Sequence, residues 1–360
     1  MKNKKILIGI SSFLFIVLFY FLYSSSKSQI EKNIASLNGY QPPQGTYFYG
    51  LETNFNKVSC EGFLQYTCTI EDINVKIKGT KNPILKIEKA YVKDINLFKN
   101  KDTELNIDLK NVEPKGQLQD IIYPQSLTYN DSKEIAKDIY KNLFPLNLSL
   151  YVKIHKYMNK EGINSGKGSI KITAEDNAFY FAGGADIETI GTKDRYSVVI
   201  DKNGTLIRDK NISGKKLAEY KMNQHYYTLI SKANFEFKNK KVFNTFYKMY
   251  QLNMKEYPYK RKGINENILG ISSEEILSFD KFKEEFLNRM KEYQQANENK
   301  IGKESSSFLM DMINGSKNDI KFSMKLKKYI TLEEYLVLSG LTKDNEKIIE
   351  TYFDTKTETK

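Results

Sequence analysis

The sequence predicts an α+β fold in which an N-terminal transmembrane helix and an antiparallel β-rich region precede a helical region with a late strand. Three observations predict it. An uninterrupted apolar run comes first. Many short runs before residue 212 then alternate apolar and polar residues, as strands with one solvent-exposed face do. From residue 213 onward, apolar residues recur at spacings of three and four, as in amphipathic helices.

The apolar run extends from Ile6 to Tyr23 and contains neither a charged residue nor a proline. As a helix it would span about 27 Å, close to the hydrocarbon thickness of a bilayer. Three lysines within residues 1–5 predict a cytoplasmic tail and export of everything after the run. We therefore expect a single-pass protein of the bacterial inner membrane, with most of the chain in the periplasm. A signal peptide cleaved near Ser24–Ser26 is the alternative interpretation.

The rest of the chain divides into a linker and two periplasmic domains. The segment 24–44 begins with serines and ends near Pro42-Pro43, which predicts the linker. Residues 45–212 are the expected β-rich domain, and residues 213–360 are the expected mainly helical domain.

Strands are expected where apolar and polar residues alternate, and Asn203-Gly204 between two such runs predicts a hairpin turn. The apolar residues that mark the expected strands are Ile73, Val75, Ile77, Leu85, Ile87, Leu105, Ile107, Leu109, Leu146, Leu148, Leu150, Val152, Ile154, Ile170, Ile172, Tyr196, Val198, Ile200, Leu206 and Ile207, and late in the chain Ile320, Phe322, Met324 and Leu326. The polar tail Thr355–Lys360 is expected to be frayed.

Helices are expected where a capping box precedes apolar residues at helical spacing. The boxes are Asp131 with Glu134, Ser272 with Glu275, and Thr331 with Glu334. A further helix is expected at Ser305–Asn314, because Gly315 can end it as a C-cap.

Two cysteines, Cys60 and Cys68, lie close together and are the only cysteines of the chain. Such a pair in an exported domain predicts a structural disulfide, which stabilises the fold by about 2.5 kcal/mol in the chain-entropy model. A redox-active pair would more often have the Cys-x-x-Cys spacing. A zinc site is disfavoured because neither His155 nor His225 is near in sequence. We therefore predict no metal site.

Motifs that resemble catalytic or cofactor sites do not meet the spacing that their chemistry needs. The segment Gly162–Gly168 has three residues between its first glycines, where a phosphate-binding loop needs four. Ser213 and Lys216 match Ser-x-x-Lys, but the companion motifs of that class are absent from the sequence. We predict no catalytic residue and no cofactor.

Asn203 and Asn211 are candidate glycosylation sites. Each begins an Asn-x-Ser/Thr acceptor and follows an aspartate two positions earlier. This pattern resembles the extended acceptor of bacterial N-glycosylation systems. Chance occurrence in a chain rich in Lys, Asn and Asp is the equally weighted alternative.

A basic cluster occupies residues 213–262, which hold twelve Lys or Arg against three Glu, with eleven aromatic residues interleaved. Such a surface can bind an anionic lipid or glycan. A solvated face above packed aromatic residues is the alternative. The residues expected on this anionic-ligand surface are Lys238, Lys240, Lys241, Lys260, Arg261 and Lys262.

The segment Asn56–Phe98 contains successive strand patterns at Cys68–Ile77, Pro83–Ile87 and Tyr91–Leu97. Together with the N-terminal apolar run, this stretch resembles the start of AsmA-like bacterial envelope proteins. The resemblance covers about one eighth of the chain and implies an inner-membrane helix with a β-rich periplasmic part implicated in lipid handling. The helices expected after residue 213 depart from the long β-groove of that family.

These observations predict a membrane-anchored, non-enzymatic envelope protein that binds an anionic lipid, a glycan or a protein partner. Export argues against a nucleic-acid partner. An envelope hydrolase is one alternative, and it would need polar residues that converge in a pocket. A scaffold subunit of an inner-membrane complex is the other, and it would present a flat apolar patch to a stoichiometric partner.

Overall fold

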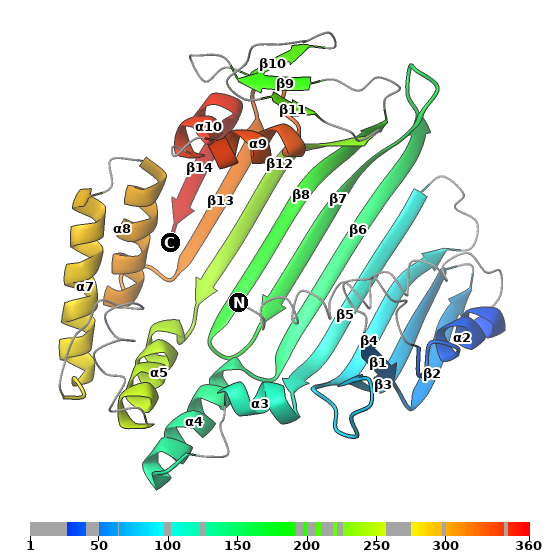
Figure 1. Cartoon of the computed structure of the whole chain (residues 1–360). Coiled ribbons are helices and arrows are strands. Elements are labelled where there is room, and N and C mark those ends of the chain that lie inside the picture. The colour runs from blue at the N-terminus through cyan, green and yellow to red at the C-terminus, as the bar shows by residue number, and fades with distance from the viewer. Residues whose placement is uncertain are drawn as a thin grey trace.

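The computed structural model describes residues 27–40, 50–63, 65–96, 102–122, 127–191, 197–200, 206–209, 219–221, 226–256, 275–296, 300–341 and 345–360. Within these residues, one antiparallel sheet of eleven strands dominates the fold (Figure 1). A separate three-stranded sheet lies beyond one end of the large sheet.

The large sheet has the order β1-β3-β4-β5-β6-β7-β8-β12-β13-β14, and β2 pairs with β3 next to β1. Its strands are β1 (Leu51–Asn54), β2 (Lys57–Phe63), β3 (Gln65–Ile77), β4 (Leu85–Asn96), β5 (Asp102–Pro114), β6 (Leu146–Met158), β7 (Asn164–Glu175), β8 (Phe179–Gly191), β12 (Tyr226–Asn239), β13 (Asp319–Leu326) and β14 (Phe353–Thr359). The small sheet consists of β9 (Ser197–Ile200), β10 (Leu206–Asp209) and β11 (Glu219–Lys221).

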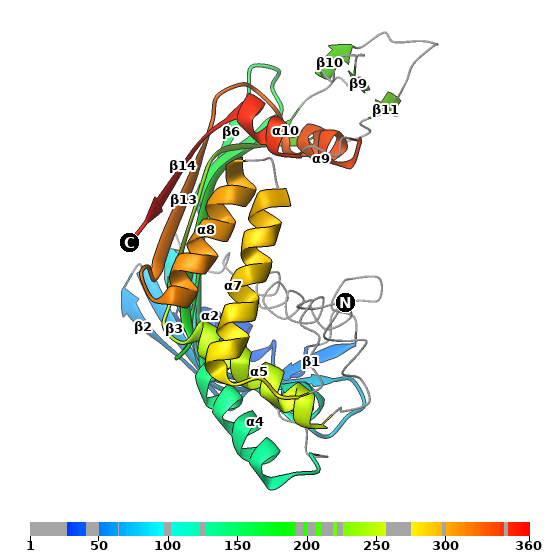
Figure 2. The same ribbon diagram turned by 90° about the vertical axis from the view of Figure 1, so that its left-hand side faces the viewer.

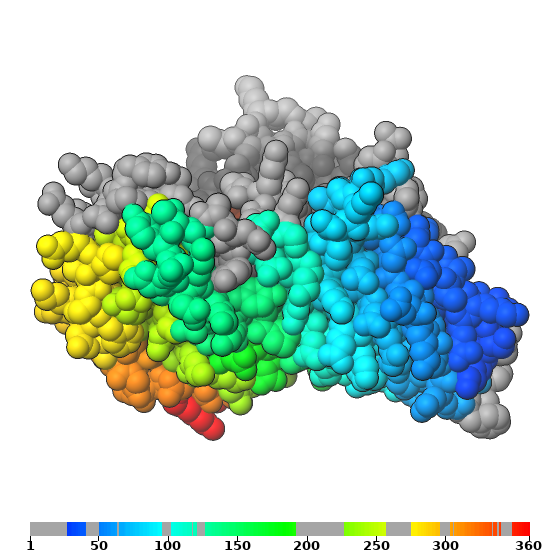
Figure 3. Space-filling model, turned by 90° about the horizontal axis from the view of Figure 1, so that it is seen from below, coloured from blue at the N-terminus to red at the C-terminus, as the bar shows by residue number. Residues whose placement is uncertain are grey.

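The helices that pack against the later strands lie on one side of this sheet, which curves around them (Figure 2). The helices of the described residues are α2 (Lys27–Ala35), α3 (Gly116–Ile122), α4 (Asn130–Leu143), α5 (Val242–Glu256), α7 (Phe279–Ala296), α8 (Lys300–Asn314), α9 (Leu332–Leu341) and α10 (Asn345–Tyr352). Seen from below, the N-terminal elements and α7 lie at opposite ends of the molecule (Figure 3).

The predicted fold class was wrong, because the sheet does not end before the helical region. β12, β13 and β14 all follow residue 213, and they complete the same sheet. β8 and β12 pair from Phe179↔Asn239 to Tyr226↔Gly191, although more than thirty residues separate them in the chain. The boundary expected between residues 212 and 213 lies outside the described residues.

The transmembrane helix expected at Ile6–Tyr23 also lies outside the described residues. In the part of the chain that the structure describes, no helix combines the length and apolar character needed to cross a bilayer. The described part of the chain forms a large antiparallel sheet with packed helices.

The expected linker contains helix α2, whose Ile30 and Ile34 are buried.

One face of the sheet is apolar and the other is polar, because side chains alternate along each strand. A single cross-strand row on the apolar face contains Cys60, Cys68, Val92, Ile107, Leu150, Ile172, Gly183, Phe235, Phe322 and Thr357. The adjacent row on the polar face contains Lys93, Asn106, Tyr151, Lys171, Gly184, Asn234, Ser323 and Lys356.

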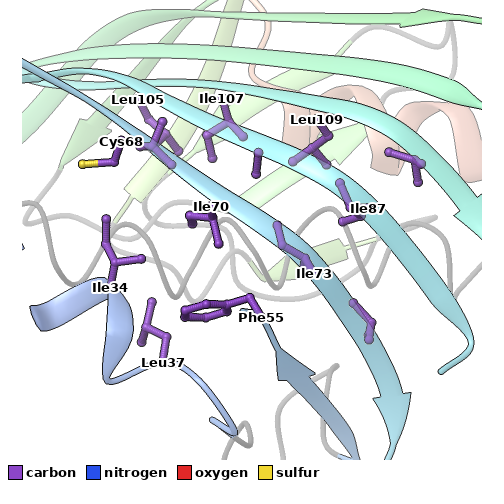
Figure 4. Close-up of a cluster of buried hydrophobic side chains, with 14 of the residues drawn as sticks. Ile34, Leu37, Phe55, Cys68, Ile70, Ile73, Ile87, Leu105, Ile107 and Leu109 are labelled. Atoms are coloured by element: carbon purple, nitrogen blue, oxygen red, sulfur yellow. The ribbon is translucent and has the colours of Figure 1, made fainter. Parts of the chain in front are cut away.

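The largest core lies where α2 covers the apolar face of β3, β4 and β5 (Figure 4). Ile34 and Leu37 approach Ile70 and Ile73 there, and the cross-strand half-cystine Cys68 is fully buried. Glu31 fixes the helix to β2, because its carboxylate accepts a hydrogen bond from the backbone N–H of Cys60 at 2.8 Å.

A second core is aromatic and joins α5 to α7. Phe282 is fully buried between Phe243 and Tyr250, with ring centroids 5.7 and 4.6 Å away. The predicted three-and-four spacing on both helices therefore places aromatic side chains in a core, where each buries a large apolar area.

Two of the predicted helix boundaries were confirmed. Thr331 and Glu334 form a reciprocal capping box, with N···O distances of 2.8 and 3.2 Å. Gly315 follows α8 with a φ of 77°, a conformation that glycine adopts without strain.

Three predicted local features came out differently. Asp131 lies in the first turn of α4 but does not cap it, because its carboxylate instead pairs with Lys255 of α5. Ser272 lies outside the described residues, and α7 begins later, at Phe279. The tail expected to be frayed is largely β14, and Lys360 exchanges backbone hydrogen bonds with Asp319.

Candidate functional site

An apolar cavity lies between the large sheet and the pair of helices α9 and α10. Its volume is about 270 Å³. The strands β12, β13 and β14 provide one wall, and α9, α10 and the segment before α9 provide the other. The lining residues are Ile230, Phe322, Met324, Ile330, Thr331, Leu332, Tyr335, Ile349 and Phe353.

Local sequence explains how α9 is held above the sheet. The capping box at Thr331 and Glu334 starts the helix immediately after the buried Ile330. Leu338 and Ile348 then pack with Ile330 into a small core beside the cavity. Because this core anchors both ends of the helical pair, the cavity roof is joined to the sheet by apolar contacts.

An exposed apolar band leads away from the cavity across the sheet. Phe322 lines the cavity and stacks on Phe235 of β12, with ring centroids 5.4 Å apart. Phe235 is 36 % exposed, and Ile172 on β7, two strands away, is 41 % exposed. Among the described elements, none lies over the middle of β6, β7 and β8 (Figure 1). The band therefore presents a contiguous apolar surface beside the cavity.

Gly183 lies in this band between Phe235 and Ile172. A Cβ atom at this position would come within 3.1 Å of Cζ of Phe181. The glycine therefore leaves space for the Phe181 ring. Because it has no side chain, the surface of the band is lower at this point of β8.

The size and lining of the cavity suit an alkyl chain. Apolar cavities of about 150 Å³ stay dry and bind small hydrocarbons, and whole-ligand pockets commonly have about 300–1,000 Å³. The cavity falls between these values, so it has room for part of a long apolar ligand. None of the described lining residues is charged, and the buried hydroxyl of Thr331 accepts a hydrogen bond from the Glu334 N–H.

The paired titratable residues of β6 lie on the opposite, polar face. The Tyr157 hydroxyl donates to Glu188 at 2.5 Å, and this hydrogen bond raises the pKa of Tyr157 to about 12. His155 lies 2.5 Å from Asp102. Across the described ranges, no three His, Cys, Asp or Glu residues are grouped so that they could hold a metal ion.

The predicted disulfide between Cys60 and Cys68 is confirmed, with an S–S distance of 1.98 Å. The two residues are directly opposite on β2 and β3. They belong to the core under α2, at the far end of the sheet from the cavity. Their role is therefore to hold the sheet edge together.

The predicted glycosylation sites Asn203 and Asn211 lie outside the described residues. The flanking strands β9 and β10 do pair in antiparallel register, with Ile200 opposite Leu206. They form part of the small sheet. Use of the two sites stays a prediction.

The predicted anionic-ligand surface is described at three of its residues. Lys238 lies 3.3 Å from Glu236, whose hydrogen bond raises the Lys238 pKa. Lys240 pairs with Glu175 at 2.7 Å. Lys241 precedes α5, and its carbonyl accepts a hydrogen bond from a helix N–H. The remaining residues, Lys260, Arg261 and Lys262, lie outside the described residues, so this surface stays a prediction.

No protein-family model matches the chain, and no curated protein matches its sequence.

The cavity residues were missed because they looked like ordinary core positions. Phe322 and Met324 were expected on a strand, and Thr331 as a cap. One signal was available: Leu336, Val337 and Leu338 of α9 are consecutive apolar residues, which a helix cannot place on a single buried face. Its Leu336 is 59 % exposed.

Proposed function

We propose that this chain is an exported, lipid-binding protein of the bacterial envelope, held on the periplasmic side of the inner membrane. One alkyl chain of the lipid enters the cavity under α9 and α10. The remainder of the ligand lies along the apolar band past Phe235 toward Ile172.

The main observation behind this proposal is that the cavity is continuous with the exposed apolar band. Burial of a methylene group contributes about 0.8 kcal/mol, so a long alkyl chain gains binding free energy at every carbon that it places on these surfaces. A glycan would need polar partners, which the cavity lining does not provide. The AsmA-like resemblance of residues 56–98 supports the same proposal.

The sequence supports the proposed location. The lysines and apolar run at the N-terminus favour export and membrane attachment. The Cys60–Cys68 disulfide fits an oxidising compartment such as the periplasm. The net charge of +12 favours a lipid with an anionic headgroup.

The hydrolase alternative is less well supported by the cavity. It would require an acid, a base or a nucleophile beside the bound ligand. Among the described lining residues, Thr331 alone has an aliphatic hydroxyl, and its position is that of a helix cap.

A cavity-filling variant tests the proposal. Met324→Trp would occupy the space that the alkyl chain takes, and Ile349→Phe would do so with a smaller change in volume. Met249→Trp is the matched control, because Met249 lies on α5 outside the lining and is 39 % exposed. The full-length chains are purified in one detergent, and the lipid retained by each is quantified by native mass spectrometry.

We expect the wild type and Met249→Trp to retain lipid, and both filling variants to retain much less while still unfolding cooperatively. Loss of the bound lipid should itself lower their melting temperature. Equal retention by all four proteins would refute the cavity as the lipid site. Retention of a glycan or a protein in place of lipid would favour the other binding roles.

A further inference from the structure

The free edge of the large sheet is formed by β14. In the described part of the chain, β14 pairs with β13 alone (Figures 1 and 2). From Asp354 to Lys360, charged residues alternate with threonines. Thr357 is in register with Phe322, so the threonines lie on the apolar face and the charged side chains on the polar face.

The hydrogen-bond pattern shows which backbone groups point away from β13. Lys360 and Asp319 exchange both N–H···O bonds, at 2.9 and 3.0 Å. In an antiparallel ladder such pairs occur at every second residue. Glu358 and Lys356 therefore also bond toward β13. Thr355, Thr357 and Thr359 direct their N–H and C=O groups outward, along the open edge.

We propose that this edge pairs with β14 of a second copy of the chain, antiparallel and with the two-fold axis at Thr357. Thr357 then exchanges hydrogen bonds with its own counterpart, and Thr355 does so with Thr359 of the other copy. The outward groups of Thr355, Thr357 and Thr359 then gain partners. This interface is isologous, as in most two-fold dimers.

Charge complementarity disfavours a two-fold axis at a charged residue. Strand overlap then favours Thr357 over Thr355 and Thr359, because those two axes pair opposite charges at fewer positions. On the polar face, Lys356 lies opposite Glu358 of the other copy, and Asp354 lies opposite Lys360. Opposite charges at facing positions stabilise an antiparallel pair, and like charges destabilise it. Moving the axis to Glu358 would place Glu358 against itself and Lys356 against Lys360. Moving it to Lys356 would place Lys356 against itself and Asp354 against Glu358.

Charged residues on an edge strand usually prevent edge-to-edge pairing. On β14 the charges alternate in sign, so two antiparallel copies of this strand place opposite charges against each other. Threonine has a high strand propensity, and facing threonines are favourable cross-strand pairs. The dimer interface is formed by β14, whose Thr357 hydroxyl donates to Glu304 of α8 at 2.9 Å and whose Phe353 lines the cavity. Dimerisation does not require bound lipid.

Cysteine cross-linking tests the register in the full-length chain. At a hydrogen-bonded antiparallel pair the Cα atoms are about 5.5 Å apart, within the range of about 4.4–6.8 Å that a disulfide spans. Thr357→Cys should therefore form a covalent dimer on oxidation. Thr359→Cys is the matched control, because its counterpart would lie roughly 13 Å away along the strand. Both native cysteines are already paired with each other.

Charge substitutions test the complementarity. Lys356→Glu places glutamates opposite each other, and Glu358→Lys places lysines opposite each other. We expect each purified variant alone to sediment as a monomer and an equimolar mixture to form a heterodimer. Circular dichroism checks that both variants stay folded. Thr357→Pro should also be monomeric, because proline removes an outward N–H, whereas Thr357→Val keeps this N–H and should dimerise.

A monomeric wild type at all soluble concentrations would overturn the proposal. Dimerisation of Thr357→Pro at wild-type strength, or equal cross-linking at positions 357 and 359, would place the contact elsewhere. The two tests stay distinguishable although Met324 is in register with Thr355 of β14, because the lipid test measures retained lipid and the dimer test measures oligomeric state and cross-linking.

Discussion

Phe235 and Phe322 face each other on β12 and β13, with ring centroids 5.4 Å apart. Phe322 belongs to the cavity, whereas Phe235 belongs to the exposed band. The stacked pair therefore joins the cavity to the exposed band. An alkyl chain too long for the cavity would cross this pair.

Phe235→Ser should weaken lipid binding, and it should also lower stability because the ring stacks on Phe322. Burying a phenylalanine side chain is worth about 1.5–3 kcal/mol, so the dissociation constant should rise about tenfold or more. The affinity can be measured by titration with a fluorescent fatty acid. Met249→Ser, at a similarly exposed position on α5, is the control and should bind as the wild type does. Unchanged affinity in Phe235→Ser would remove the band from the binding site.

The double variant Cys60→Ala, Cys68→Ala should unfold more easily. The disulfide closes a short loop, so its loss should lower the free energy of unfolding by about 2.5 kcal/mol. Chemical denaturation monitored by circular dichroism measures this difference. The wild type under reducing conditions should shift toward the same midpoint. Lipid binding should change little, because the bond lies at the other end of the sheet from the cavity.

Thr331→Ala should loosen α9 and the roof of the cavity. The Thr331 hydroxyl accepts the Glu334 N–H at 3.2 Å, and losing a cap of this kind costs about 1 kcal/mol. We expect faster hydrogen exchange in residues 332–341, with the core under α2 unaffected. Thr331→Ser retains the hydroxyl and should restore protection. Equal exchange in Thr331→Ala and the wild type would show that packing alone holds the helix.

The contact between α4 and α5 should weaken in acid. The Asp138 carboxylate accepts a hydrogen bond from Lys248 at 2.7 Å, and this bond lowers the pKa of Asp138 below its ordinary value of 3.8. A lowered folded-state pKa means that the stabilisation is complete above the ordinary carboxyl pKa. It is lost as the pH falls through the lowered value.

Asp138→Asn tests this pH dependence. The carboxylate is half exposed, so the variant should lose less than about 1 kcal/mol at neutral pH. The difference from the wild type should vanish at a pH below the folded-state pKa. Thermal unfolding across a series of acidic pH values measures this difference in stability. Lys248→Met, alone and combined with Asp138→Asn, completes a double-mutant cycle for the pair. A difference that persists in strong acid would contradict the assignment.

Several elements were predictable because their signals are local. Alternation in Leu146–Ile154 predicted β6, and the Thr331–Glu334 box predicted the start of α9. Two cysteines at close spacing predicted the disulfide. In each case, the interacting groups are neighbours in sequence, so a short window contains the whole physical reason.

The strands that were missed lack a clear local signal. β8 contains Gly183-Gly184, which interrupts alternation on both faces. In β12 a register shift between Ile230 and Lys232 changes which positions face the core. β14 is a polar edge strand, and its alternation of charge with threonine resembles a frayed tail until its partner β13 is known.

The sequence by itself determined where the chain is apolar, which helices are capped and which cysteines can bond, because these depend on neighbours within one or two turns. Only the tertiary structure decided that β12 joins β8, that Phe235 meets Phe322, and that α9 and α10 cover a cavity. Those contacts bring together segments far apart in the chain. They depend on register and packing across the whole sheet, which no local pattern specifies.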